Sequence, residues 1–437
     1  MELNRGKVCS CGKRHVNDAV KALVVQRGAL EEIPRLLKEM GCQHPFVIMD
    51  LNTKAAAGNE VVRVLERAHM PLSVFVYETT DPVPPTEEEL GKVVMRWDPE
   101  ADGILAVGSG VINDLSKFVS RATGRHYILV LTAPSMDGMV SPTSSVDVDG
   151  LKVSLPSATA WAVVADLDVL ANSPRHMIAS GLGDMLAKYI SLTEWKLSNL
   201  INGEYYCPEI AAMIRKALDS ELRAAPRLLQ GDCEAVKEVT DGLLLAGCAM
   251  AYAGVTRPAS GMEHYISHII DMRHLAFGTP CDLHGIQCGV ATLYALRMYE
   301  RIQRIDHVDI QKANAYAANF SYEKWKQVLR SYVGPAAESM IALEAKERKY
   351  DLAEHAKRLE VIARKWPEIR QVVATLPKAE KVEKVMRSLS MPTRLEEVGV
   401  ETRNIPTHVK CTKDIRKKYV GSWLLWDIGM LDEIVGK

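Results

Sequence analysis

The chain has 437 residues, of which 47% are hydrophobic and 25% are charged. These proportions are those of folded globular proteins and exclude extensive disorder. Lys and Arg total 54 against 55 Asp and Glu, so no net charge draws the chain toward nucleic acid or an anionic membrane. The length exceeds what one ordinary core holds, so we expect two domains.

The cellular setting follows from the apolar runs and the cysteines. No run approaches the roughly 18 apolar residues that a membrane span needs, and the first residues lead into no apolar segment of a secretion signal. Nine cysteines in a chain of this length fit a reducing compartment better than a disulfide framework. We therefore expect a cytoplasmic enzyme or binding protein with no membrane span and no nucleic-acid partner.

The first 170 residues alternate strand patterns with helix patterns. Strands are expected at 45–50, 72–77, 103–107, 127–131 and 162–165, helices at 54–68, from 86 onward and at 111–122, and a hairpin within 146–153. Such alternation predicts a parallel sheet with helices on both faces. After residue 173 helical patterns dominate. We expect a Rossmann-like α/β domain over 1–173 and an all-α domain over 174–437.

A glycine-rich turn joins the expected strand 103–107 to the following helix. Gly108-Ser109-Gly110 lets backbone N–H groups approach a pyrophosphate at a helix N-terminus, and Asn113 and Asp114 follow in the first turns. The spacing departs from the usual dinucleotide fingerprint, so a turn that merely joins strand to helix stays an alternative. Asp50, at the end of an earlier strand, could bind a ribose and favour NAD over NADP, or could cap a helix.

The loop after the expected strand 127–131 offers further polar groups. It reads Thr132-Ala133-Pro134-Ser135-Met136-Asp137-Gly138, and ligands gather at this edge of open parallel sheets. The hydroxyls of Thr132, Ser135 and Ser141 are cofactor-binding candidates, and Asp137 could orient a substrate hydroxyl. A plain turn is the alternative.

Three stretches in the chain offer the donors of a catalytic metal site. Asp184 supplies a carboxylate, and His264 and His284 supply two imidazoles. Two nitrogen donors and one oxygen donor leave coordination positions open for a substrate oxygen, as catalytic sites require. His268 lies four residues after His264 and therefore on the same helix face. Taken singly, Asp184 could be a helix cap and each histidine a core or surface residue.

Cysteines near the N-terminus suggest a second metal or redox site. Cys9-Ser10-Cys11-Gly12 with His15 provides three donors, but a structural zinc site needs a fourth and none is evident in sequence. A solvated N-terminal segment is the preferred interpretation.

In chain order these motifs resemble the sn-glycerol-1-phosphate dehydrogenases, a branch of the iron-containing alcohol dehydrogenase superfamily. The resemblance covers about residues 20 to 300. The stretches that carry it are Val107-Gly108-Ser109-Gly110 with Asp114, the loop 132–138, Ala165 to Leu170, Ser180-Gly181-Leu182-Gly183-Asp184, Arg257-Pro258-Ala259-Ser260-Gly261-Met262-Glu263-His264 and His284-Gly285. The run from Arg257 to His264 is the most discriminating.

The resemblance implies a dehydroquinate synthase-like fold, with a cofactor domain followed by a helical domain. It implies that Asp184, His264 and His284 bind one divalent ion (zinc, nickel or iron), and that NADH or NADPH reduces dihydroxyacetone phosphate reversibly to sn-glycerol 1-phosphate. Asp137 and His268 would then assist catalysis, and the product would usually serve phospholipid biosynthesis. The superfamily also suggests a homo-oligomer, either a homodimer or a larger ring. Candidates for binding the substrate phosphate are Lys188, Arg257 and Lys152.

Two other functions stay open at this point. A glycerol or polyol dehydrogenase would act on an unphosphorylated alcohol with the same metal and cofactor. A non-catalytic binding protein could keep the fold without the activity, although retention of all three ligand types argues against it.

Overall fold

The computed structural model describes residues 8–16, 18–149, 151–228 and 230–436. The chain forms two compact units, the first chiefly from residues 13–185 and 216–254 and the second chiefly from 186–215 and 255–437. The expected boundary at 173 precedes α7 (Arg175–Leu186) and α10 (Cys233–Ala253), and both helices belong largely to the first unit. Long helices after 173 therefore do not all belong to a separate helical domain.

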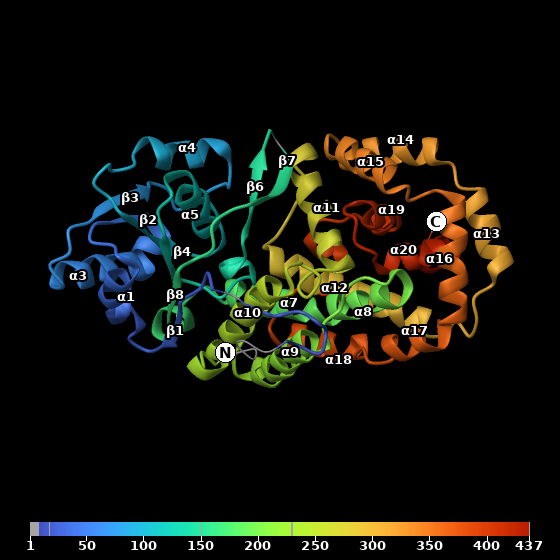
Figure 1. Cartoon of the computed structure of the whole chain (residues 1–437), viewed down its shortest axis with the longest axis horizontal. Coiled ribbons are helices and arrows are strands. Elements are labelled where there is room, and N and C mark those ends of the chain that lie inside the picture. Colours follow the sequence, from blue (N-terminus) through green and yellow to red (C-terminus); the bar gives the residue numbers. More distant parts are fainter. Residues whose placement is uncertain (1–7, 17, 150, 229, 437) are drawn as a thin grey trace. The chain divides into compact units, whose positions relative to one another are not determined.

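A six-stranded parallel sheet forms the centre of the first unit (Figure 1). Its strand order is β1-β8-β5-β4-β2-β3. The strands are β1 (Ala22–Gln26), β2 (Pro45–Asp50), β3 (Ser73–Tyr77), β4 (Gly103–Gly108), β5 (Tyr127–Leu131) and β8 (Ala162–Asp166). The register pairs Gly108 with Leu131, so β4 and β5 end side by side and their following loops share one edge.

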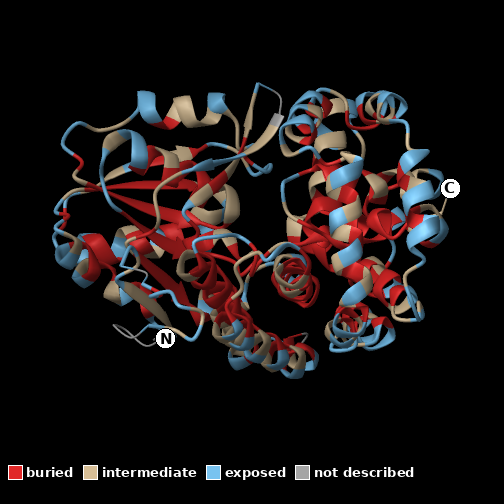
Figure 2. Ribbon diagram, turned by 45° about the vertical axis from the view of Figure 1, so that its right-hand side comes forward, coloured by how far each residue is buried: buried red, intermediate tan, exposed pale blue. Residues whose placement is uncertain are grey.

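Both faces of the sheet are covered, which explains its continuous apolar strands. Alternate strand residues such as Val47, Leu105 and Val130 pack in one core with Leu36 and Val61 of the helices α1 (Ile33–Met40) and α3 (Asn59–Arg67). The opposite face is covered by α5 (Gly110–Thr123). Figure 2 shows the central strands as buried: β2, β4, β5 and β8 are buried along nearly all of their length, whereas the edge strands β1 and β3 are only partly buried.

The predicted strands and helices of the first 170 residues are confirmed with small shifts at their ends. The expected helix 54–68 is divided into α2 (Leu51–Thr53), the π-helical η2 (Lys54–Gly58) and α3, and the hairpin consists of β6 (Thr143–Val148) and β7 (Leu151–Pro156). Sequence analysis did not assign β1, α1 and η1 (Ala29–Glu32). The other elements here are α4 (Glu87–Met95), η3 (Gly138–Val140) and α6 (Leu167–Ala171).

Helices make up the rest of the chain, as the sequence predicts. α9 (Pro208–Leu228) contributes to both units. The second unit contains α8 (Lys188–Asn202), α11 (Met262–Phe277), α12 (His284–Ile302), α13 (Ile310–Ala318), α14 (Tyr322–Val333), α15 (Ala336–Glu347), α16 (Leu352–Arg364), α17 (Trp366–Val373), α18 (Ala379–Ser388), η4 (Leu395–Val398), η5 (Thr402–Asn404), α19 (Ile405–Cys411), η6 (Thr412–Asp414), α20 (Gly421–Asp427) and α21 (Leu431–Val435).

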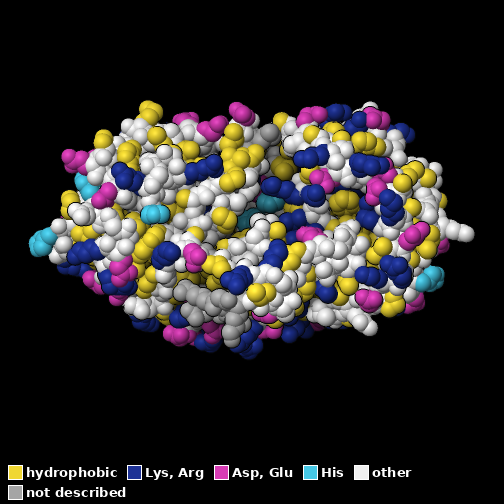
Figure 3. All heavy atoms as spheres, in the orientation of Figure 1, with side chains coloured by type: hydrophobic (Ala, Val, Ile, Leu, Met, Phe, Trp, Pro, Cys, Tyr) yellow, Lys and Arg dark blue, Asp and Glu magenta, His cyan; other side chains and the backbone are white. Residues whose placement is uncertain are grey.

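The outer surface agrees with the balanced composition. Basic and acidic side chains intermingle over the face seen in Figure 3. Among the residues that the structure describes, no helix combines the length and the apolar character needed to cross a bilayer.

Candidate active site

The glycine turn between β4 and α5 is tight enough to require glycine at position 108. A Cβ atom on Gly108 would lie 2.5 Å from Cβ of Ile112, closer than side chains tolerate. Ser109 precedes the helix without capping it through its side chain. The first N–H groups of the 14-residue helix α5 therefore meet no serine cap, which suits an anionic group at this end.

The loop after β5 is bonded directly to this turn. The backbone N–H of Thr132 donates to the carbonyl of Gly108 at 3.1 Å, and the hydroxyls of Ser109 and Ser135 lie 2.6 Å apart. The parallel register of β4 and β5 brings these two loops together. The candidates Gly108, Ser109, Thr132 and Ser135 therefore form one polar edge in the first unit.

Asn113 and Asp114 are held inside the fold by their own partners. The Asn113 amide donates to the Met139 carbonyl at 3.2 Å and accepts from the Tyr127 hydroxyl at 3.0 Å. Asp114 accepts from the Ser145 backbone at 3.1 Å. These contacts fix both side chains beneath the turn, and the cofactor contact considered from sequence stays a prediction.

Lys117 is a buried residue of the turn region that sequence analysis did not single out. Its fully buried ammonium group donates to Asp114 at 3.0 Å and to the carbonyls of Gly138 and Thr143 at 2.7 and 3.0 Å. It also reaches the Ser141 hydroxyl at 3.3 Å. Ser141 thus joins the network that fixes the loop after β5. A lysine one turn after an aspartate looks like an ordinary helix pair in sequence, so only its burial reveals this role.

Asp50 is a helix cap in the structure. Its carboxylate accepts from the Thr53 backbone at 2.7 Å, and the Thr53 hydroxyl accepts from the Asp50 backbone at 3.0 Å. This capping box engages one carboxylate oxygen. The ribose contact considered from sequence stays a prediction.

Helix α7 brings Asp184 to the loop after β5 within the first unit. Gly181 permits this approach, because a Cβ there would lie 2.0 Å from the Pro134 carbonyl oxygen. The Ser180 hydroxyl donates to the Ser135 carbonyl at 2.8 Å, and buried Asp184 accepts from the Asp137 backbone at 2.8 Å. The predicted metal ligand and the predicted substrate-orienting residue are therefore neighbours.

In the second unit, Glu263 orients the imidazole of His264. Its Oε1 accepts from Nδ1 of His264 at 2.9 Å and from the Gly261 backbone at 2.7 Å. A carboxylate that accepts a hydrogen bond from Nδ1–H leaves Nε2 with its lone pair, which is the arrangement of metal-bound histidines. Sequence analysis named Glu263 only as part of the run from Arg257 to His264 and gave it no role.

His284 has a corresponding partner. The Ser267 hydroxyl donates to the Gln287 amide oxygen at 2.8 Å, so it can accept from Nδ1 of His284 at 3.1 Å. The rings of His264 and His284 lie 5.1 Å apart between centroids, and His268 lies 6.4 and 5.9 Å from them. The three histidines thus surround one region of the second unit.

Cys288 adds a thiol to this group. It lies one turn after His284 on α12, with Sγ 3.6 Å from Nε2 of that residue. His264, His284 and Cys288 each offer a donor atom within 4.8 Å of the others. Burial raises the pKa of the Cys288 thiol, but the two imidazoles lower it by more, so the net shift is downward. Sequence analysis overlooked this residue.

A second buried carboxylate supports the start of α11. Glu194 accepts from the Met262 backbone at 2.9 Å, the Gly421 backbone at 2.7 Å and the Tyr299 hydroxyl at 2.9 Å. Burial and the nearby charge of Glu263 raise the pKa of Glu194 to about 8. From α8, Glu194 therefore holds the start of the helix that carries the predicted ligand His264.

The cations proposed for a substrate phosphate differ in their surroundings. The Arg257 guanidinium is buried, pairs with Glu204 at 2.6 Å and donates to the Tyr419 carbonyl at 2.8 Å. All three nitrogens of this guanidinium are therefore engaged within the protein, and the phosphate contact considered from sequence stays a prediction. Lys188 is buried at the start of α8, and Lys152 is half-buried on β7.

Lys418 lies beside the same segment and was missed from sequence. Its ammonium group donates to the carbonyls of Thr256 and Ser260, both at 3.1 Å. Burial, reinforced by the positive charge of Arg257, lowers the pKa of Lys418 to about 7. It holds the stretch that precedes the predicted ligand His264.

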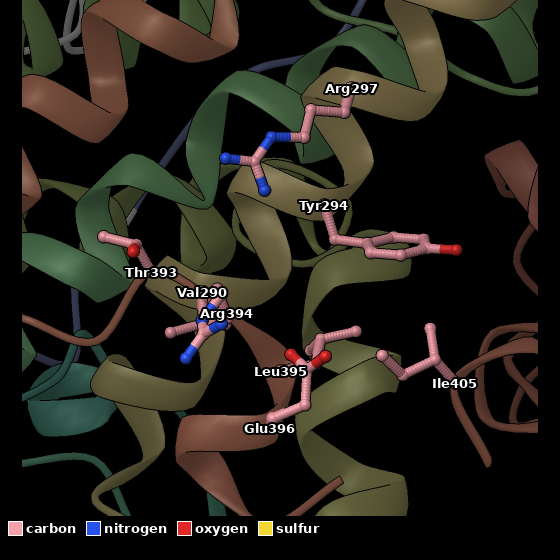
Figure 4. A pocket seen from close by; sticks show the side chains of 8 residues that line it. All are labelled: Val290, Tyr294, Arg297, Thr393, Arg394, Leu395, Glu396 and Ile405. Carbon is pink, nitrogen blue, oxygen red and sulfur yellow. The ribbon is translucent and has the colours of Figure 1, made fainter. Parts of the chain in front are cut away.

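A cavity of about 200 Å³ lies further along α12 (Figure 4). Val290, Tyr294 and Arg297 of that helix line it together with Thr393, Arg394, Leu395, Glu396 and Ile405. Its lining contains none of the predicted site residues, so it is separate from the histidine group.

Comparisons with known proteins identify the family to which the chain is similar. Residues 24–174 match the family model described as iron-containing alcohol dehydrogenase. The chain is 34% identical over 298 residues to a glycerol-1-phosphate dehydrogenase [NAD(P)+] of Halalkalibacterium halodurans, covering 68% of this chain and 75% of the relative. It is 27% identical to the Bacillus licheniformis protein of the same name, covering 98% and 94%.

A solved structure shows the same fold. It is an iron-containing alcohol dehydrogenase from Thermococcus thioreducens, with 16% identity, a TM-score of 0.60, and coverage of 96% of this chain and 99% of the other. At this identity the likeness establishes the fold alone. The identity to the Halalkalibacterium relative goes further: this chain belongs to the glycerol-1-phosphate dehydrogenase family.

Proposed function

We propose that the protein is a metal-dependent oxidoreductase that reduces dihydroxyacetone phosphate reversibly to sn-glycerol 1-phosphate with NADH or NADPH. The single observation that carries the proposal is the histidine pair His264 and His284, whose Nδ1 atoms are both engaged by neighbouring residues. Such engagement prepares Nε2 of each ring for a metal ion. Membership in the family supplies the substrate and the cofactor.

The donor set fits one divalent ion. We assign Asp184 as the third ligand, from the first unit, where it is anchored beside Asp137. Two imidazoles and a carboxylate suit zinc, nickel or iron, and the nearby Cys288 thiol favours the more thiophilic ions, zinc among them. When bound, a divalent ion supplies Lewis-acid polarisation of the substrate oxygen, and a nicotinamide supplies the reducing equivalent.

The proposed cofactor contacts belong to residues of the first unit. The turn Gly108-Ser109-Gly110 would receive the cofactor pyrophosphate at the start of α5, with Ser135 and Thr132 beside it. Asp137 would orient a substrate hydroxyl.

In the second unit, His268 would pass a proton to or from the substrate. Lys188 remains the first candidate for the substrate phosphate, with Lys152 of the first unit as the second. A homo-oligomeric, cytoplasmic enzyme remains part of this proposal.

A substrate panel distinguishes this activity from its alternatives. Purified protein is assayed with dihydroxyacetone phosphate and with unphosphorylated glycerol, each with both cofactors, before and after chelation and metal add-back. We expect turnover of the phosphorylated ketone that chelation removes and add-back restores. Preference for glycerol would indicate a polyol dehydrogenase. Metal binding without turnover of any substrate would indicate a non-catalytic binding protein.

A further inference from the structure

The N-terminal segment forms a tight loop rich in metal donors. Cys9 and Cys11 are two residues apart, and the backbone N–H of Cys9 donates to the Lys13 carbonyl at 2.9 Å. Gly12 has φ +83°, a left-handed conformation that closes the loop. This geometry directs two thiols from a short stretch of chain toward one point.

The missing fourth donor of this segment comes from a distant part of the sequence. Cys207 lies just before α9, and its thiol, the thiols of Cys9 and Cys11 and a ring nitrogen of His15 all lie within 4.8 Å of one another. Cys207 and His15 are buried, and Cys9 and Cys11 are half-buried. Three thiols and one imidazole are a donor set of structural zinc sites.

The spacing is close to what a tetrahedral zinc ion requires. With zinc–sulfur bonds of about 2.3 Å, the edges of the tetrahedron are about 3.8 Å long. Donor atoms within 4.8 Å of one another therefore need to move by about 1 Å or less. Side-chain rotation alone supplies such a movement.

Neighbouring groups prepare the donors. Nδ1 of His15 donates to the Tyr252 carbonyl at 2.9 Å, which leaves Nε2 as the ligand atom. The Tyr205 hydroxyl lies 3.5 Å from Sγ of Cys11. A phenol O–H at this position can donate a hydrogen bond to the sulfur of Cys11.

The loop is also fixed in place by its remaining polar residue. Both the backbone N–H and the hydroxyl of Ser10 donate to Glu209 Oε1, at 3.2 and 2.9 Å. The position of Cys11 beside Cys207 therefore does not depend on the thiols alone.

We propose that Cys9, Cys11, His15 and Cys207 bind one zinc ion in a structural site. All four positions of a tetrahedron are taken by protein ligands, so no position is open to a substrate. The ion would tie the N-terminal loop to the α8–α9 connection. This site is independent of the histidine group on α11 and α12 and of the proposed dehydrogenase activity.

Metal content of the full-length, reduced protein tests the site. We compare zinc per chain, measured by mass spectrometry after zinc loading and desalting, for wild type, Cys11→Ser, Cys9→Ser and the half-buried control Cys233→Ser. We expect both loop variants to bind one zinc equivalent fewer than wild type, and the control to bind the full amount. Equal zinc content in all four proteins would overturn the proposal.

Two further measurements distinguish loss of zinc at the cysteine site from misfolding of the variants and from zinc bound at the histidine group. The variant His264→Ala should keep the zinc of the cysteine site, and titration of its thiols with a mercurial should release that zinc. Cobalt loaded into this variant should show the intense near-ultraviolet absorption of thiolate ligands. Absence of both the released zinc and the absorption would refute the site even if the loop variants fail to fold.

Discussion

Replacement of Glu263 tests the preparation of the histidine ligands most directly. In the structure its Oε1 accepts hydrogen bonds from Nδ1 of His264 at 2.9 Å and from the Gly261 backbone at 2.7 Å. Glu263→Gln keeps the shape and an acceptor oxygen but removes the negative charge that makes the imidazole a stronger donor. Glu263→Ala removes both.

The expected loss follows from the position of Glu263 behind the ligand. Removing an outer partner of a metal-bound histidine costs about 10- to 100-fold in affinity, or about 1.4 to 2.7 kcal/mol. We expect Glu263→Gln near the lower value and Glu263→Ala near the upper one. Loss of this buried charge also removes a cause of the raised pKa of Glu194, so Glu263→Gln should not destabilise the fold.

Competition with a fluorescent zinc chelator measures the affinity of the metal-depleted protein at neutral pH. Glu344→Gln is the matched control, because Glu344 is also buried and its pKa is raised to about 9 by burial and by Asp414. The control should bind metal as wild type does. Affinities within twofold of wild type in both Glu263 variants, or an equal loss in the control, would refute the reasoning.

Three further outcomes follow from single contacts. Lys117→Met removes a buried ammonium group and leaves its four acceptors without that donor. The variant should lower the free energy of unfolding by about 3 kcal/mol in urea titrations and raise KM for the cofactor. Unchanged values of both would contradict the positioning role of Lys117. Gly181→Ala places a Cβ atom 2.0 Å from the carbonyl oxygen of Pro134, so helix α7 must shift. Because this shift moves Asp184, kcat should fall about 100-fold. A loss of activity below twofold would show that the helix tolerates the methyl group. Burial lowers the pKa of His408 to about 4, while an unfolded histidine takes up its proton near 6.5, so stability is lost as pH falls through this window. The loss amounts to about 3 kcal/mol between pH 7 and pH 4, and His408→Gln, which can still bond the Ile266 carbonyl, should lack this component in denaturation curves measured across pH.

The sequence by itself determined the local elements and the motifs. Apolar runs of five or six residues predict the buried strands, because a strand covered on both faces excludes polar side chains along its whole length. Thr86 predicts the start of α4, and its hydroxyl does cap that helix. The residue types at 184, 264 and 284 indicate a metal because carboxylate and imidazole are its ligands.

The tertiary structure alone decided which side chains meet. The pairing of Arg257 with Glu204 and the burial of Lys117 beside Asp114 are visible only in the fold. Cys207 could not be joined to Cys9 and Cys11 by any local pattern. Periodicity and capping act over a few neighbouring residues, whereas a partner far along the chain is chosen by how helices and loops pack. The partner of a predicted ligand, such as Glu263 beside His264, and the donor that completes a cluster, such as Cys207, are therefore decided by the fold.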